Sequence, residues 1–198
     1  YCFNLHDQRT IFGLLESQKS ATMSFLTASY NEERTFNSIR EQAAAVIVGI
    51  NNELQKHIPK QVGRFDDSFN INCTGDYFTS RGFPTILFEA GHYANDYNRD
   101  EVRKFVFIAL NAAISFINEN DIVSNDLGNY LNIYQNNKCF YDFIFKNVRI
   151  NDNNVEKNIK FAVQYKEVLL EGKITFIPEI IQIENLDSFF AHQTIDFE

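Results

Sequence analysis

Short apolar runs alternate with long amphipathic segments over the first 120 positions of the chain. Residues 1–5, 21–30 and 83–89 form compact runs rich in apolar and β-branched side chains, which is typical of buried strands. Residues 31–58 and 98–118 repeat apolar positions every three or four residues, which is the spacing of one helix face. This order of strands and helices predicts an α/β fold.

Polar residues mark the ends of both predicted helices. Asn31 and the acidic Glu32 after it fit the cap and first turn of a helix, and Pro59 follows the end of that helix. Asn98, with Glu101 three positions later, has the spacing of a capping box. We therefore expect the helices to begin after Asn31 and Asn98.

Two polar stretches, 61–81 and 119–137, lack a clear period and predict loops. Beyond them the pattern changes to period two, and residues 140–150, 159–166 and 173–183 are predicted to be half-solvated antiparallel strands. Turn-forming residues separate these strands at positions 151–154 and 171–172. The sequence thus predicts an α/β domain over residues 1–137 and a small β-rich module over residues 138–198.

Composition excludes two classes of partner. The net charge of −8 and the pI of about 5.0 argue against binding to a nucleic-acid backbone, which requires clustered cations. No apolar stretch is long enough to span a bilayer, so no membrane partner is expected. Cys2, Cys73 and Cys139 are too few and too far apart for a disulfide framework, which slightly favours a reducing, cytoplasmic compartment.

The first residues suggest that a segment precedes them. The chain opens on an apolar, strand-like run without an initiator methionine or a basic leader. We therefore expect it to be the C-terminal part of something longer, with a processed chain of complete fold as the alternative.

Among the four histidines, His6 has the most informative position. His57 follows the first helix and His192 lies in the C-terminal tail, so both are expected at the surface. His6 stands where the first strand leaves the sheet, and ligands bind at the carboxyl edge of open α/β sheets. It fits a metal ligand or a general base, or a hydrogen-bonded histidine with no chemical role.

Glu89 is a carboxylate at the inner end of a buried strand, where an unpaired charge is costly. It is either the ion-pair partner of Arg81 or a catalytic acid–base. Gly91 permits a sharp turn after it, and His92 is then expected near the same rim. If His6 and Glu89 converge, they favour metal-assisted hydrolysis.

Two motifs resemble the zinc carboxypeptidase family, which includes succinylglutamate desuccinylase-like and aspartoacylase-like relatives. Residues 82–92 (GFPTILFEAGH) and 96–99 (DYNR) resemble its catalytic-glutamate strand, and residues 3–9 (FNLHDQR) resemble its third zinc-ligand strand. The resemblance covers residues 1–118 and implies the C-terminal half of a mixed-sheet α/β sandwich. It also implies that His6 binds zinc, and that Glu89 takes a proton from the bound water and passes it to the leaving amine.

The chain departs from the family pattern in its metal ligands. The family holds zinc with an upstream His-x-x-Glu pair, and none of the four histidines here has a Glu three positions later. We therefore expect this chain alone to bind zinc weakly. Three further residues are candidates for substrate binding: Arg9 and Arg81 for an anionic substrate, and Tyr77 for the family's substrate-facing tyrosine, with a purely structural role as the alternative.

The function that these features favour is zinc-dependent hydrolysis of an amide bond in a peptide or an N-acyl amino acid. The alternative is a non-catalytic binding or scaffold domain that retains the hydrolase fold, with Glu89 in an ion pair. A metal-free esterase is disfavoured because the sequence contains no G-x-S-x-G motif.

Overall fold

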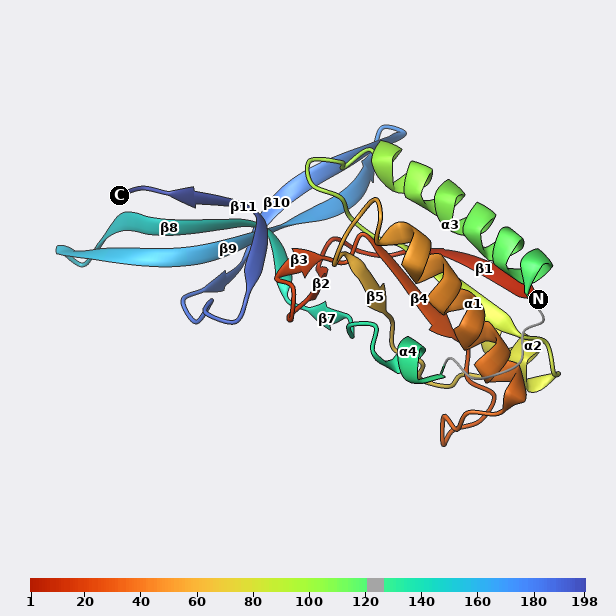
Figure 1. Cartoon of the computed structure of the whole chain (residues 1–198). Coiled ribbons are helices and arrows are strands. Elements are labelled where there is room, and N and C mark those ends of the chain that lie inside the picture. The colour runs from red at the N-terminus through yellow and green to blue at the C-terminus, as the bar shows by residue number, and fades with distance from the viewer. Residues whose placement is uncertain (121–126) are drawn as a thin grey trace. The chain divides into compact units, whose positions relative to one another are not determined.

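The computed structural model describes residues 1–120 and 127–198, which form two compact units, Tyr1–Asn137 and Lys138–Glu198 (Figure 1). The first unit mixes helices and strands, so the chain belongs to the α/β class. Its elements are β1 (Cys2–Asp7), β2 (Phe12–Leu14), β3 (Lys19–Ser20), β4 (Met23–Thr27), α1 (Ser38–Leu54), β5 (Val62–Arg64), α2 (Thr74–Ser80), β6 (Thr85–Ala90), α3 (Asp100–Glu119) and α4 (Leu127–Leu131). Strand β7 (Asn137–Lys138) falls at the boundary, and the second unit contains β8 (Phe140–Asp152), β9 (Val155–Leu170), β10 (Lys173–Ile183) and β11 (Phe190–Asp196).

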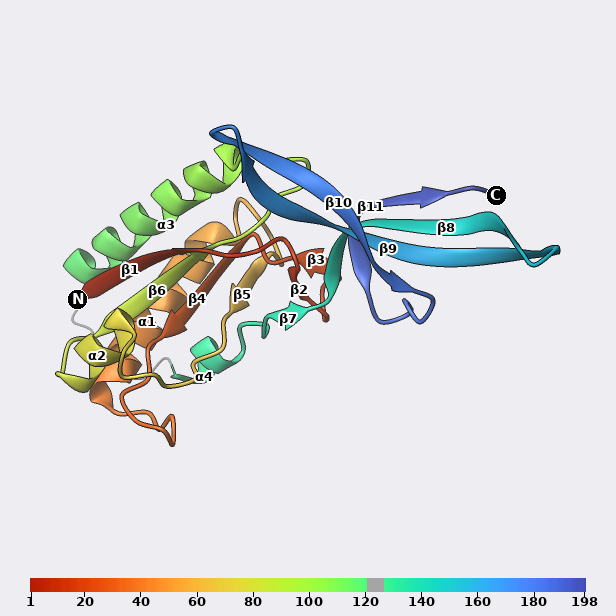
Figure 2. The same cartoon turned by 180° about the vertical axis from the view of Figure 1, so that it is seen from behind.

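A four-stranded mixed sheet with the order β1-β6-β4-β5 is the centre of the first unit (Figure 2). Strand β1 runs parallel to β6, β4 runs antiparallel to β6, and β5 runs parallel to β4. All five residues of β4 are buried. The strands predicted at 1–5, 21–30 and 83–89 are therefore confirmed as β1, β4 and β6, although β4 is shorter than its apolar run. The prediction that the first of them is buried was wrong, because β1 is an edge strand without a buried residue.

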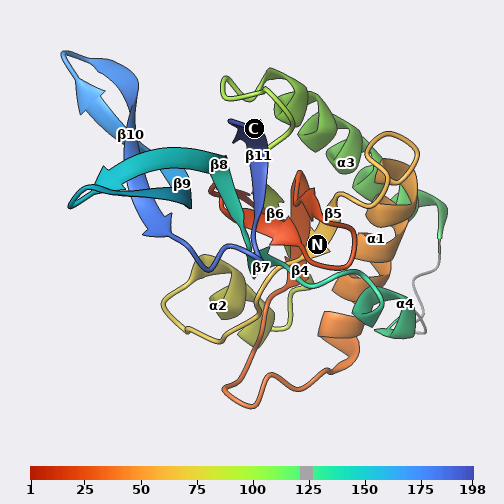
Figure 3. The same cartoon turned by 90° about the vertical axis from the view of Figure 1, so that its left-hand side faces the viewer.

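The main core lies on one face of this sheet, under α1 and α3. Side chains on a strand alternate between faces, so Phe25, Ile86 and Phe88 share the face that the apolar positions of both helices cover. The rings of Phe25 and Phe88 meet edge to face, with centroids 5.1 Å apart. Figure 3 shows the strands nearly end-on, between α2 on one side and α1 and α3 on the other.

Helix α1 begins at Ser38, later than the pattern predicted. The Asn31 side chain does not cap this helix, because its Oδ1 accepts a hydrogen bond from the Thr35 N–H and closes a local turn. Asn37 is the cap instead, and its side chain accepts a hydrogen bond of 3.0 Å from the Arg40 N–H. The prediction of a helix was correct, and the prediction of its cap was wrong.

The cap predicted for α3 was also wrong. The helix begins at Asp100 after Arg99, whose φ of 63° is left-handed. Asp96, not Asn98, supplies the capping carboxylate, which accepts hydrogen bonds from the backbone N–H groups of Asp100 (2.8 Å) and Val102 (3.0 Å). Each oxygen of one carboxylate thus satisfies a donor that the first helical turn leaves open.

Both stretches predicted as loops contain short elements. Residues 61–81 include β5 and α2, and residues 119–137 include α4, with 121–126 outside the described residues. These elements are only three to seven residues long. So few residues do not repeat an apolar position often enough to show a period, so the sequence pattern did not predict them. No helix of the described chain has the length and apolar character needed to cross a membrane.

The second unit is a four-stranded sheet with the order β10-β9-β8-β11. The predicted strands are present, and two-residue turns join them at Asn153–Asn154 and at Glu171–Gly172. All four turn residues have positive φ, between 49° and 77°, as tight hairpins require. Strand β11 was not predicted. It pairs parallel to β8, and its His192 is half-buried on the Phe140 ring, 5.0 Å between centroids, so the prediction of an exposed tail histidine was wrong.

Candidate functional site

The structure brings His6 and Glu89 together on neighbouring parallel strands. The β1–β6 register pairs the Cα atoms of these two residues, at the position where both strands approach their carboxyl ends. Side chains at paired positions point to the same face of a sheet, and adjacent strands lie about 4.8 Å apart. The imidazole and the carboxylate therefore lie side by side at the carboxyl edge of this parallel pair.

The next two strands extend this polar row. Ser24 on β4 is the register partner of Glu89, and Gly63 on β5 is the partner of Ser24. The row His6, Glu89, Ser24 and Gly63 lies on the face opposite Phe88, away from α1 and α3. A line of polar or small residues thus crosses all four strands.

Asn136 connects the row to the loop that follows β1. Its Nδ2 donates to Ser24 Oγ (2.8 Å) and to Gln8 Oε1 (2.7 Å), and Gln8 Nε2 donates to the Ala21 carbonyl oxygen (2.9 Å). A Cβ atom on Gly63 would lie 1.9 Å from Asn136 Oδ1, so only glycine leaves room for this amide. The network fixes the backbone beside Glu89.

Arg99 holds the ends of β1 and β6 together. Its guanidinium donates to Asp7 Oδ1 (2.7 Å) and to the carbonyl oxygens of Ala90 (2.8 Å), Gly91 (2.7 Å) and Gln8 (3.2 Å). Guanidinium suits this position because it presents five donors in a rigid plane. The Arg99 side chain thus binds the carboxyl ends of both β1 and β6, and it stabilises the register that places His6 opposite Glu89.

The Glu89 carboxylate is buried without a compensating charge. The residue is 6% exposed, and within residues 1–120 and 127–198 its carboxylate has no hydrogen bond and no ion pair. Burial, and then the negative charge of Asp7, raise the pKa of Glu89 from 4.5 to about 7. The group thus changes between acid and base near neutral pH, where a general base is most effective.

The raised pKa of Glu89 predicts a specific pH dependence of stability. Between pH 4.5 and about 7 the folded state holds a proton that the unfolded state has lost. Raising the pH through this window therefore lowers the free energy of unfolding, by up to about 3 kcal/mol in total, and the effect levels off above pH 7. We expect Glu89→Gln to remove this dependence and to be more stable than the parent at pH 8. Urea unfolding of both proteins from pH 4 to 9 measures the difference, and parallel curves would contradict the burial argument.

The two histidines that the sequence predicted near this rim differ in their exposure. His6 is exposed, whereas His92 is buried with its ring on that of Tyr97, 4.8 Å between centroids. No group of three or more His, Cys, Asp or Glu side chains able to hold a metal occurs in the described part of the chain. A zinc site needs at least three protein ligands, and His6 is the ligand that the sequence predicts here.

The predicted substrate-binding residues are divided between the two ends of the sheet. Arg9 is exposed three positions after His6, on the loop that leaves the carboxyl end of β1. Arg81 precedes β6 and lies at its amino end, and the four residue steps from Thr85 to Glu89 alone span about 13 Å. An ion pair between Arg81 and Glu89, one reading of the sequence, is therefore wrong.

Tyr77 lies on α2, the helix on the same face as Glu89. Gly75 of this helix approaches the Leu87 side chain, where a Cβ would be 2.6 Å away. Tyr77 itself is 50% exposed, with its ring 6.1 Å from that of Phe78. His57, at the end of α1, is exposed as predicted.

Sequence reasoning missed the supports of the site. No motif marks Ser24 or Asn136, and Gln8 and Arg99 were noticed only as parts of the two resembling motifs. The one further signal was the polar stretch His6, Asp7 and Gln8 directly after the apolar run 1–5. Comparisons with protein-family models, curated proteins and solved structures give no match for this chain.

Proposed function

We propose that this chain is part of a zinc-dependent hydrolase of the carboxypeptidase type, which cleaves an amide bond in a peptide or an N-acyl amino acid. The observation that supports this most is the buried Glu89 carboxylate, without an ion pair in the described structure, directly opposite His6. In this proposal Glu89 is the general base and His6 is one zinc ligand.

Glu89 is suited to the proton transfers of amide hydrolysis. Its carboxylate takes a proton from water as the water oxygen forms a bond to the amide carbonyl carbon. The same proton then passes to the amide nitrogen, and the carbon–nitrogen bond breaks to give an acid and an amine. A pKa of about 7 favours both transfers, because the group is neither too weak a base nor too weak an acid.

Arg9 fits the role of a substrate cation better than Arg81 does. It is at the same end of the sheet as Glu89, and its guanidinium can bind a carboxylate through two hydrogen bonds. We therefore assign the substrate carboxylate to Arg9 in this proposal. Tyr77 remains a candidate on the same sheet face.

The alternative proposal is a binding or scaffold domain that has the same fold and no catalytic role. It expects the Glu89 charge to be satisfied by an ion pair. The absence of such a pair in the described residues favours the hydrolase, since a purely structural position gains nothing from an unpaired buried carboxylate.

Zinc binding to the 198-residue chain tests the assignment of His6. No group of three or more possible metal ligands occurs among the described residues, so we expect less than one zinc to remain per chain after dialysis against micromolar zinc. At higher zinc concentrations, NMR should show perturbed ring signals of His6, and His6→Ala should lose that response. His57→Ala is the matched control with an exposed histidine elsewhere, and it should keep the His6 response.

Two results would contradict this assignment. One tightly held zinc per chain would mean that the chain contains a complete ligand set. A zinc response that His6→Ala leaves unchanged would remove His6 from the site. An assay on peptides with free and blocked C-termini accompanies the titration, and this chain alone is expected to cleave neither.

A further inference from the structure

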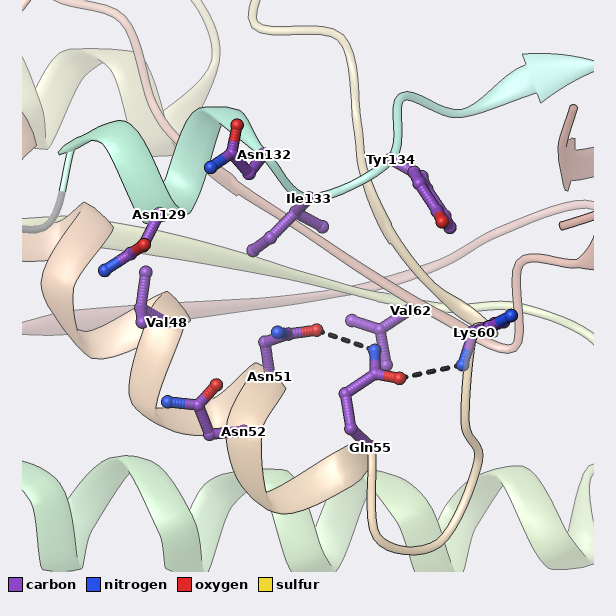
Figure 4. A pocket seen from close by; sticks show the side chains of 10 residues that line it. All are labelled: Val48, Asn51, Asn52, Gln55, Lys60, Val62, Asn129, Asn132, Ile133 and Tyr134. Carbon is purple, nitrogen blue, oxygen red and sulfur yellow. Dashed lines mark hydrogen bonds between the residues drawn. The ribbon is translucent and has the colours of Figure 1, made fainter. Parts of the chain in front are cut away.

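An amide-lined pocket lies on the first unit, apart from the row that contains Glu89. It has a volume of about 430 Å³ and is bounded by the C-terminal half of α1, the segment before β5 and the α4 region (Figure 4). Val62 of β5 belongs to it and is the register partner of Met23, a residue of the main core. Gly63, the next residue, belongs to the Glu89 row, so the two sites lie on opposite faces of the sheet.

The pocket has an apolar floor and a polar rim. Val48, Val62 and Ile133 are 2–8% exposed and form the floor. The rim carries five side-chain amides, one tyrosine and one lysine, and no carboxylate is among its described lining residues. Each amide offers both donors and an acceptor, so the rim can exchange hydrogen bonds of both directions with one ligand.

One wall of the pocket is already fixed. Gln55 Nε2 donates to Asn51 Oδ1 (2.9 Å), and Gln55 Oε1 accepts from the Lys60 N–H (2.8 Å), as Figure 4 shows. Lys60 has a left-handed φ of 61°, which turns the chain around the Gln55 side chain. A wall that is ordered before binding lowers the entropy cost of ligand capture.

Other rim groups retain their hydrogen-bonding capacity. Within residues 1–120 and 127–198, the amides of Asn52 and Asn132, the Tyr134 hydroxyl and the Lys60 ammonium make no hydrogen bond to the protein. They come from α1, the residues after α4 and the segment before β5, and they border one hollow. Their donors and acceptors are therefore available to a bound molecule.

We propose that this pocket binds a monosaccharide-sized sugar. A sugar ring has carbon–hydrogen faces that match the apolar floor, and its hydroxyl groups both donate and accept, as the amide rim does. Among the described lining residues, a multiply charged anion would find one cation and a cation would find no carboxylate. The volume lies within the range of small-molecule sites.

Side-chain NH₂ signals of asparagine and glutamine report on this pocket directly. We expect glucose, N-acetylglucosamine or glucuronate, titrated into the ¹⁵N-labelled 198-residue chain, to shift the NH₂ signals of Asn51, Asn52 and Asn132 saturably in the millimolar range. A tighter response to glucuronate than to glucose would assign the Lys60 ammonium to a sugar carboxylate. The Glu89 row lies on the other face, so this binding does not depend on the proposed hydrolase activity.

A matched pair of variants separates binding from folding. Asn132→Leu should weaken the saturable response at least tenfold, while Asn111→Leu, the same change at an exposed position of α3 outside this pocket, should leave it unchanged. Thermal unfolding of both variants checks that they fold, and Asn52→Leu replaces Asn132→Leu if the latter does not. Linear, non-saturating shifts with all three sugars would overturn the proposal, as would saturation by glycylglycine alone.

Discussion

In the intact zinc hydrolase proposed above, replacement of Glu89 by glutamine is expected to lower turnover by about a hundredfold or more, the usual loss when a general base is removed. Glutamine has nearly the same shape and cannot accept a proton from water. The neighbouring row of His6 and Ser24 should remain in place, because the register depends on backbone pairing and on Arg99. The loss should therefore appear in kcat more than in zinc content.

Turnover and metal content of the same preparations measure this effect. Glu16→Gln is the matched control, since Glu16 is an exposed glutamate in the turn before β3, and its replacement should leave the rate unchanged. A Glu89→Gln enzyme with full zinc and undiminished turnover would exclude Glu89 as the base. Loss of zinc together with activity would instead indicate a ligand role.

Replacement of Gly91 by alanine is expected to be the most destabilising single-methyl addition near the site. A Cβ atom there would lie 2.0 Å from the carbonyl oxygen of Ala21 and 2.6 Å from Gln8 Nε2. The Gly91 N–H also donates to the Thr22 carbonyl oxygen at 2.9 Å, so the two backbones are held close together. Because one clash is with a backbone atom, the structure can relax only by moving a strand end. We therefore expect the free energy of unfolding to fall by about 3 kcal/mol.

Urea unfolding followed by circular dichroism measures this loss. Gly128→Ala is the control, because a Cβ at this α4 position meets nothing within 4 Å. That change should be neutral or slightly stabilising, since alanine has the higher helix propensity. Equal midpoints for Gly91→Ala and the parent would show that the strand ends are not closely packed.

The pattern of apolar residues was enough to predict the two long helices and six of the strands, while the short elements and β11 were missed. The strand positions of β8, β9 and β10 followed from period two and from the turn residues between them, such as Glu171 and Gly172. Helices α1 and α3 followed from apolar positions at spacings of three and four. Such predictions succeed because each depends on neighbours in the sequence.

Capping was predicted less well, although it is also local. Asn31 and Asn98 both have the residue type of a cap, and the caps used are Asn37 and Asp96. Arg40 accounts for part of the first difference, because its buried guanidinium takes the carbonyl oxygens of Arg34 and Thr35 as acceptors. These two carbonyl oxygens accept hydrogen bonds from the Arg40 side chain, and the residues that carry them precede the helix.

The sequence by itself determined that Glu89 lies near the end of a buried strand and that His6 lies near the end of an apolar one, since both facts depend on the residues beside them. Only the tertiary structure decided that β1 pairs with β6, in the register that sets His6 opposite Glu89. Ser24, Asn136 and Arg99 joined this site through contacts between segments far apart in the chain. A local pattern fixes how a strand alternates, whereas its partner and register are chosen by the packing of the whole domain.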